Sequence, residues 1–167
     1  MTTADLSDAD PGRWQPCSLP WRSFGGVPAF SGPAQTVRCR DDNGLVRAAL
    51  SEPGQQRVLV VDGGGSLRTA LVGDTLAGLA LANGWAGVLV HGAVRDVVAL
   101  STMPIAVFAL GTNPRRGARA GTGARGGDVV FGGARFLPGA QVSADEDGVL
   151  VEATGPAGAP ELAAPAS

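Results

Sequence analysis

The clearest pattern along the chain is a short apolar run followed by a helical stripe and a second apolar run. Arg57 to Asp62 (RVLVVD) is continuously hydrophobic, which is typical of a strand covered on both faces. The glycine turn Gly63-Gly64-Gly65-Ser66 ends that run. Residues 69–83 then carry apolar side chains at helical spacing, and Gly84 is a C-cap signal, so we expect one helix over 69–83 with this stripe: Val72, Leu76, Leu79 and Ala80.

A second apolar run, Gly87 to His91, follows that helix directly. A strand, a helix and a strand within roughly 35 residues form a βαβ unit, in which the two strands lie parallel. The pattern therefore predicts an α/β fold with a parallel pair of strands at its centre.

The flanking segments predict further short elements. We expect helices near TADLSDA, over Gly44 to Leu50 after the capping pair Asp42-Asn43, and over Val94 to Leu100. Residues 14–33 are rich in proline and glycine and predict an irregular wrap with short strands, and Asn113 to Gly127, with five glycines and four arginines, predicts a flexible surface loop. Strands are expected at Ala34 to Cys39, Ile105 to Leu110, Asp128 to Phe131, Ala134 to Phe136, Ala140 to Ser143 and Val149 to Glu152.

The length of 167 residues suits one domain, which we place at residues 1–152. Residues 153–167 (ATGPAGAPELAAPAS) contain too little apolar mass to order themselves, so we expect a disordered tail. The segment after Met1 is acidic and lacks the apolar core of a signal peptide. Cys17 and Cys39 are expected to be free thiols, and the protein is expected to be cytoplasmic.

Charge and composition narrow the classes of function. The formal net charge is −2 and no basic block occurs, which argues against a nucleic-acid partner, and no apolar run is long enough for a membrane span. All 13 basic residues are arginines, so lysine Schiff-base chemistry is excluded, and the absence of tyrosine excludes a phenolic acid. His91 is the single histidine, so any metal bound by one chain would have oxygen ligands, which favours Mg²⁺ or Mn²⁺.

The candidate chemistry lies where the two parallel strands end. Carboxyl ends of parallel strands meet at one edge of a sheet, which brings Gly73-Asp74-Thr75-Leu76 close to Arg95 and Asp96. Free backbone N–H groups in a first helical turn suit a carboxylate or phosphate. The alternative for Asp96 is a favourable charge at the start of the next helix, and Asp74 alone could be a solvated helix residue.

Two other features have less specific interpretations. The turn VVDGGGS suggests a dinucleotide-binding loop, but it lacks the required glycine spacing because position 68 is arginine. His91, at a strand end, is interpreted as a hydrogen-bonded structural histidine rather than a metal ligand.

The stretch VLVVDGGGSLRTALVGDTLAGLALANGWAGVLVHGAVRDV closely resembles the RraA-like family, the regulator-of-ribonuclease-E-activity A proteins, which includes metal-dependent 4-hydroxy-4-methyl-2-oxoglutarate aldolases. The likeness extends through FGGVPAFSGPAQTVRCRDDN, ALGTNPRRG and FLPGAQVSADEDGVLV, and so covers nearly the whole chain except the tail. The resemblance implies a three-layer β/β/α swivelling-domain fold. It also implies a homotrimer or dimer of trimers with active sites at subunit interfaces.

The aldolase members carry an Asp, twenty residues, and then Arg-Asp, which Asp74, Arg95 and Asp96 match. By this resemblance Asp96 holds the divalent metal, Arg95 contacts the substrate and acts with Asp74 in catalysis, and Gly73, Asp74, Thr75 and Leu76 form the substrate-binding turn. The chain departs from the pattern at Ala99, where some members have another acid. A carboxylate donated by the C-terminal region of a neighbouring subunit could come only from Glu152 or Glu161.

The resemblance implies a lyase that cleaves 4-hydroxy-4-methyl-2-oxoglutarate to pyruvate, with decarboxylation of oxaloacetate through the same pyruvate enolate. The expected partner is then a small 2-oxo acid. A second hypothesis is a non-catalytic regulator that binds ribonuclease E or an RNA helicase. A third, a methyltransferase of quinone synthesis, is disfavoured by the missing nucleotide fingerprint.

Overall fold

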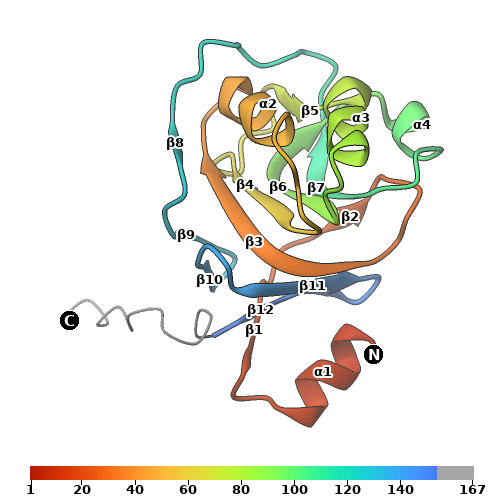
Figure 1. Cartoon of the computed structure of the whole chain (residues 1–167), viewed down its shortest axis with the longest axis vertical. Coiled ribbons are helices and arrows are strands. Elements are labelled where there is room, and N and C mark those ends of the chain that lie inside the picture. Colours follow the sequence, from red (N-terminus) through yellow and green to blue (C-terminus); the bar gives the residue numbers. More distant parts are fainter. Residues whose placement is uncertain (154–167) are drawn as a thin grey trace.

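One long strand, β3 (Phe30–Arg38), connects the two halves of the sheet in the computed structural model, which describes residues 1–153 (Figure 1). Its first residues pair antiparallel with β11 (Gln141–Asp145), and its later residues pair parallel with β4 (Val58–Asp62). The strand order from edge to edge is β1-β12-β11-β3-β4-β6-β7-β2. The remaining strands on this path are β1 (Trp14–Pro16), β2 (Arg22–Ser23), β6 (Gly87–Val94), β7 (Ala106–Thr112) and β12 (Gly148–Glu152).

The fold is mixed α/β, and β3, β4, β6 and β7 form its parallel part. Strands β4 and β6 are neighbours and parallel, which confirms the predicted βαβ unit. The continuous apolar run in β4 has a simple cause. Leu59 and Val61 pack into a cluster with the helices, whereas Val58 and Val60 pack into a second cluster on the opposite face, so both faces are buried.

Helices cover one face of the parallel strands and further strands cover the other, which gives three layers (Figure 1). The helices on the first face are α2 (Gly44–Leu50), α3 (Asp74–Ala82) and α4 (Val97–Leu100). The opposite layer contains β11, β12 and the hairpin of β9 (Val129–Phe131) with β10 (Ala134–Phe136). Helix α1 (Thr3–Ala9) lies against β11 and β12, where the Thr3 hydroxyl donates to Asp145 at 2.6 Å.

The helix predicted over 69–83 is wrong in its first five residues. Ala70–Val72 form a short buried strand, β5, which pairs parallel with the end of β6, and α3 begins only at Asp74. The Ala70 N–H donates to the Arg115 carbonyl at 2.7 Å, and this contact comes from a segment 45 positions along the chain. Such pairing overrides local helical spacing. The predicted end is confirmed, because Asn83 is the C-cap and Gly84 has φ +75°.

Strand β6 is longer than predicted and runs to Val94, with a register shift between Val90 and Ala93. The next helix therefore begins at Val97 instead of Val94. As a consequence, Arg95 and Asp96 follow the strand directly and stand beside the end of β5.

Other expectations hold closely. The helices at Thr3–Ala9 and Gly44–Leu50 and the strand at Ala134–Phe136 have the predicted bounds. The predicted flexible loop after β7 is instead tied to neighbouring elements, and it contains β8 (Ala124–Arg125), which pairs with β3. Both cysteines are free, as expected. No helix within residues 1–153 is long and apolar enough to cross a membrane, and the tail prediction for 153–167 falls almost wholly outside the described residues.

Candidate metal and substrate site

The residues singled out in the sequence meet where β5 and β6 end. The Arg95 N–H donates to the Val72 carbonyl at 3.0 Å, which holds the two chain segments side by side. Two residues after Val72 and one after Arg95, the Asp74 N–H donates to Oδ2 of Asp96 at 3.2 Å. The carboxylate of Asp96 therefore caps the amino-terminal end of α3, and the predicted convergence of positions 74, 95 and 96 is what the structure shows.

Gly73 permits this close approach. A Cβ atom at this position would lie 2.5 Å from Oδ2 of Asp96 and 3.2 Å from Cγ of Arg95. Contacts that short are not tolerated, so any side chain at position 73 would push the Asp96 carboxylate away from α3. The glycine thus allows the Asp96 carboxylate to lie against the start of α3.

Asp96 adopts a left-handed backbone conformation, with φ 60° and ψ 41°. This conformation costs roughly 1 kcal/mol for a residue with a side chain, and it persists only where the surroundings impose it. Asp96 precedes α4 but makes no side-chain capping bond to it. Its carboxylate turns instead to the start of α3 and to Arg95, whose Nε lies 3.9 Å from Oδ2, so the favourable helix-end charge of the alternative interpretation acts on α3 as well.

The first turn of α3 presents unused amide groups. The Ala77 N–H bonds to the Gly73 carbonyl, which makes it the first intrahelical bond, so the Thr75 and Leu76 amides have no acceptor within the helix. These two N–H groups and the positive end of the helix dipole favour a bound carboxylate. Thr75 is exposed, whereas the Leu76 side chain is buried in the core under the helix.

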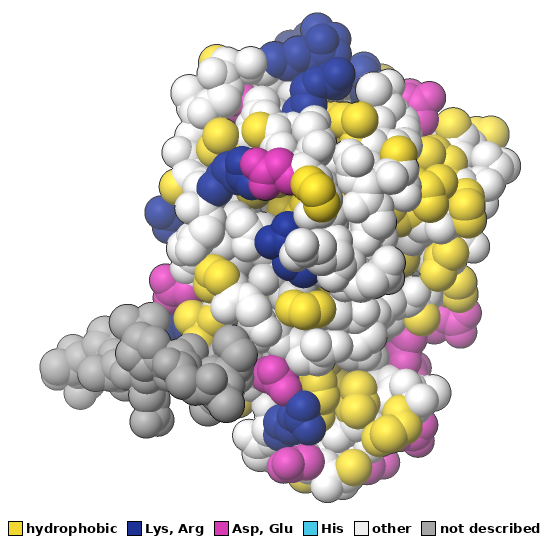
Figure 2. All heavy atoms as spheres, viewed as in Figure 1, with side chains coloured by type: hydrophobic (Ala, Val, Ile, Leu, Met, Phe, Trp, Pro, Cys, Tyr) yellow, Lys and Arg dark blue, Asp and Glu magenta, His cyan; other side chains and the backbone are white. Residues whose placement is uncertain are grey.

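Arginine side chains surround this site. Arg47 from α2 and Arg116 and Arg119 from the segment after β7 line the same pocket as Arg95 and Asp96, and the pocket volume is about 40 Å³. Figure 2 shows the blue arginine side chains gathered at this end of the molecule. Sequence reasoning missed Arg47, Arg116 and Arg119, although the arginine-rich stretch after β7 was the signal that could have found two of them.

The four guanidinium groups are close enough to influence one another. The pKa of Arg119 lies below its ordinary value because the charge of Arg116, then desolvation, and then the charges of Arg47 and Arg95 all disfavour its protonated form. Among residues 1–153, two carboxylates line the pocket, those of Asp74 and Asp96. The local charge is therefore positive, which favours an anionic ligand.

Asp42 fixes the segment that carries these arginines. Its side chain is only 3% exposed and accepts hydrogen bonds from the backbone N–H groups of Gly44, Ala120, Gly121 and Thr122 and from the Thr122 hydroxyl. Desolvation acts to raise the pKa of Asp42, but these bonds outweigh it and lower the pKa to about 2. The carboxylate stays ionised and ties α2 to the loop.

The donor groups fit a hard divalent cation that keeps part of its hydration shell. No group of three or more His, Cys, Asp or Glu side chains within residues 1–153 could enclose a metal ion. Mg²⁺ is commonly bound through one or two carboxylates with water and substrate oxygens completing its coordination. Asp96 meets that requirement, because Oδ1 has no hydrogen-bond partner in the described part of the chain and the side chain is 39% exposed.

The structure also shows where the residues lie at which the chain departs from the pattern of the aldolase members. Ala99 lies in α4, just past the motif. Glu152 lies in β12, where it accepts bonds from Arg13 at 2.6 Å and from the Gln141 backbone, so it is engaged within its own chain. Glu161 lies outside the described residues.

His91 is hydrogen-bonded, as interpreted from the sequence. Its Nδ1 lies 3.1 Å from Oδ1 of Asp62, and its ring stacks on Phe131 at a centroid distance of 4.4 Å. The glycine turn is also accounted for, because the Gly63 and Gly65 amides donate to the His91 carbonyl and the Gly64 amide donates to Asp62. These amides cannot cradle a phosphate, which agrees with the missing dinucleotide spacing.

The whole described fold has close structural relatives. A protein from Geobacillus kaustophilus, described as an S-adenosylmethionine:2-dimethylmenaquinone methyltransferase, is 51% identical with a TM-score of 0.88 over 91% of this chain and 94% of its own. The RNA-processing inhibitor RraA from Thermus thermophilis is 45% identical with a TM-score of 0.89 over 95% and 96%. A Streptomyces coelicolor member of the RNase ES inhibitor RraA family is 29% identical, with a TM-score of 0.73 over 90% and 79%.

The model of one protein family matches nearly the entire chain. It spans residues 3–151, which include the motif residues 74, 95 and 96, and its description is RraA-like, Aldolase/RraA. With the fold, the motif geometry and these relatives in agreement, the chain belongs to the RraA-like (Aldolase/RraA) family.

Proposed function

We propose that this protein is a divalent-metal-dependent lyase that cleaves 4-hydroxy-4-methyl-2-oxoglutarate to pyruvate and decarboxylates oxaloacetate at the same site. The observation that carries the proposal is the Asp96 carboxylate, held in a left-handed backbone conformation between Arg95 and the amino-terminal end of α3. In this position Oδ1 of Asp96 accepts no hydrogen bond within residues 1–153, so it can take a ligand. The surrounding arginines favour a substrate with more than one negative charge.

Asp96 is the residue that would hold the metal, Mg²⁺ or Mn²⁺. When bound, such an ion supplies a Lewis acid that stabilises negative charge developing on the 2-oxo oxygen of the substrate. The chain contains no lysine, so the same carbonyl cannot be activated as an imine.

Substrate binding would divide between two sets of donors. Arg95, which is permanently charged, donates to the 2-oxo acid end, and the Thr75 and Leu76 amides hold its carboxylate at the start of α3. Arg47, Arg116 and Arg119 then bind the distal carboxylate. Both proposed substrates are dicarboxylates, so they match a pocket with two regions of positive charge.

Asp74 would assist proton transfer during the reaction. It is exposed at the first position of α3, and we assign it to orient a water molecule. In the aldol cleavage the water removes the proton of the C4 hydroxyl, the C3–C4 bond breaks, and one pyruvate leaves while the other fragment departs as its enolate. Return of the proton to C3 gives the second pyruvate. With oxaloacetate, loss of carbon dioxide leaves the same enolate, and a proton from the water that Asp74 orients completes the reaction.

The active form would be a homotrimer or a dimer of trimers. A volume of about 40 Å³ is far below the roughly 300–1,000 Å³ of small-molecule sites, so one chain does not enclose a dicarboxylate. The motif residues are partly exposed, with side-chain exposures of 35% for Arg95 and 39% for Asp96. A neighbouring subunit placed against this surface would complete the pocket and exclude water.

The second candidate function is a regulator that binds ribonuclease E or an RNA helicase. It is favoured by the descriptions of the Thermus and Streptomyces relatives as inhibitors of RNA processing and of RNase ES. A regulator would bind its partner equally well after Asp96→Asn, because the metal site plays no part in that contact. A lyase loses its activity in the same variant.

Pyruvate release tests the proposal. Purified protein is incubated with 4-hydroxy-4-methyl-2-oxoglutarate or oxaloacetate, with MgCl₂ or with a chelator, and pyruvate is followed through a coupled dehydrogenase. The proposal requires metal-dependent turnover in the wild type that Arg95→Gln and Asp96→Asn abolish while the fold persists. The absence of turnover of both substrates in the presence of metal overturns it, and saturable binding of S-adenosylmethionine in that case favours a methyltransferase.

A further inference from the structure

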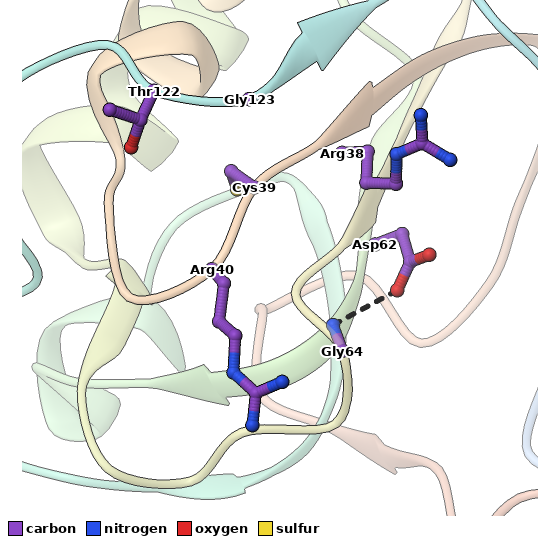
Figure 3. A pocket seen from close by; sticks show the side chains of 7 residues that line it. All are labelled: Arg38, Cys39, Arg40, Asp62, Gly64, Thr122 and Gly123. Carbon is purple, nitrogen blue, oxygen red and sulfur yellow. Dashed lines mark hydrogen bonds between the residues drawn. The ribbon is translucent and has the colours of Figure 1, made fainter.

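A second and larger pocket lies at the same edge of the sheet, between the ends of β3 and β4 and the segment before β8 (Figure 3). Its volume is about 430 Å³, within the range of about 300–1,000 Å³ that small-molecule sites occupy. The residues that line it are distinct from those of the candidate lyase site: Arg38, Cys39, Arg40, Asp62, Gly64, Thr122 and Gly123.

Two arginines supply positive charge to this pocket. Arg38 is the last residue of β3 and Arg40 lies just past its end; both are exposed, and in Figure 3 their side chains run in different directions on either side of Asp62. Within residues 1–153, no carboxylate lies within 4 Å of either guanidinium. Cys39 between them is buried in the helix-side core, and burial raises the pKa of its thiol to about 12, so it contributes no reactive thiolate.

A carboxylate stands between the two arginines in Figure 3. Oδ1 of Asp62 accepts from the Gly64 N–H at 2.9 Å and lies 3.1 Å from Nδ1 of His91. Oδ2 has no hydrogen-bond partner in the described chain, and no described buried polar atom is left unsatisfied, so Oδ2 is reachable from solvent. Stacking of His91 on Phe131 fixes the imidazole that holds Asp62.

The ionised form of Asp62 is stabilised in place. Desolvation acts to raise the pKa of this group, but the bonds from His91 and Gly64, with the charges of His91 and Arg38, outweigh it and lower the pKa. The pocket therefore offers two cationic donors around one anionic acceptor. Simple anions would meet only the arginines, whereas a ligand that also carries a donor group would meet all three side chains.

Two glycines shape this pocket. Gly64 leaves its interior open, and Gly123 allows one wall to lie close to β3. Gly64 has φ +67°, and a Cβ there would find open space with only Arg40 Nη1 at 4.0 Å, so any side chain at this position would project into the pocket. Gly123 has φ +126°, and a Cβ there would collide with the Arg38 carbonyl oxygen. That glycine lets the segment before β8 lie directly against β3 and form the wall.

We infer that this pocket binds a small organic anion that carries a hydroxyl or amino group next to its carboxylate or phosphate. Arg38 and Arg40 hold the oxyanion through charge-assisted bonds, and Asp62 accepts from the neighbouring hydroxyl or amino group. This site does not depend on the lyase proposal, because none of its residues takes part in the proposed reaction.

The test is a titration that reports on each pocket separately. Amide NMR spectra of the full chain are recorded with inorganic phosphate, glycerol 3-phosphate or glycerate, and shifts at Gly64 and Gly123 report on this pocket. Shifts at Gly73 and Thr75 report on the other pocket. We expect saturable shifts at Gly64 and Gly123 with glycerol 3-phosphate or glycerate, and whichever binds more tightly identifies phosphate or carboxylate as the recognised group.

Variants make the result decisive. Arg38→Gln with Arg40→Gln should weaken binding by at least about tenfold, whereas Arg22→Gln, a change at an exposed arginine elsewhere, should not. Asp62→Asn should weaken glycerol 3-phosphate but not sulfate, which carries no O–H donor. The inference is overturned if no probe gives saturable shifts at Gly64 and Gly123 up to about 10 mM, or if the double variant binds as the wild type does.

Discussion

The two pockets at the carboxyl edge of the sheet are built from neighbouring segments but hold their charges differently. In the smaller one, a strained Asp96, a glycine that admits no Cβ and a helix end are packed against one another within hydrogen-bond distance. In the larger one, Arg38 and Arg40 reach into a cavity about ten times as large and have no carboxylate partner in residues 1–153.

This difference shows that the volume of a cavity does not by itself indicate which pocket suits catalysis. Catalysis of bond breaking requires groups that are held in fixed positions, and the smaller pocket has such groups. The larger pocket has adaptable side chains around an anchored carboxylate, which suits recognition of a ligand without reaction. The segment after β7 forms a common wall of both pockets, since Arg119 lines one and Thr122 the other, and Asp42 binds that segment through Thr122.

The largest effect should come from removing the carboxylate of the smaller pocket. Asp96→Asn is expected to lower kcat/KM for pyruvate formation by about 10³-fold or more, because it removes the group assigned to the metal. Steady-state kinetics with saturating Mg²⁺ measure this. Asp8→Asn, a change at an exposed acid of α1, serves as the matched control and should leave the rate unaltered. Equal rates in wild type and Asp96→Asn would remove Asp96 from the mechanism.

A smaller loss is expected from a single added methyl group. Gly73→Ala should reduce kcat by about 10–100-fold, because displacing Asp96 by a fraction of an ångström disturbs the geometry of the site. Gly78→Ala in the same helix is the control, since its Cβ would meet only Met103 Cε at 3.8 Å. That change should keep the activity and raise the free energy of unfolding by about 0.5–1 kcal/mol. Full activity in Gly73→Ala would show that the close packing is not needed.

Substitutions of arginines in the two pockets should differ in their effect on the KM for a dicarboxylate. Arg119→Gln is expected to raise KM for a dicarboxylate by about five- to tenfold with little change in kcat, because it removes a distal charge. Arg38→Gln, in the other pocket, should leave both constants unchanged. If the two variants behave alike, the two pockets are not functionally distinct.

The smaller pocket shows most clearly how much of the candidate site the sequence predicts. We predicted that Asp74, Arg95 and Asp96 lie close together from their spacing and from the rule that parallel strands end at the same edge of a sheet. The structure shows this proximity. The helix at Gly44–Leu50 was predicted because its signals are local: an acidic cap before it and the breaker SEPG after it.

What escaped prediction depends on contacts between distant segments. Val72 has the right spacing for a helix, yet it pairs with β6 in a strand, and that competition cannot be read from neighbours in sequence. Arg47 and Arg119 are 72 positions apart and meet only because Asp42 binds the loop backbone to the start of α2. The pocket of Arg38 and Asp62 likewise exists only once β3 and β4 are paired.

The smallest effect concerns the common wall. The pKa of Asp42 in the folded chain, about 2, lies below its ordinary value of 3.8, so its stabilising contribution is complete above about pH 4 and is lost as the pH falls toward 2. The contribution should be about 1 kcal/mol after allowance for solvent screening. Denaturant unfolding of wild type and Asp42→Asn from pH 5 to pH 2 measures it. Parallel stability curves would contradict this role for Asp42.

Titration of Mn²⁺ followed by electron paramagnetic resonance shows whether Asp96 holds a divalent cation. Wild type should bind one Mn²⁺ per chain, and Asp62→Asn, with its change in the larger pocket, should bind it equally well. Asp96→Asn should bind at least about 100-fold more weakly. Undiminished Mn²⁺ binding by folded Asp96→Asn would show that Asp96 does not hold the cation.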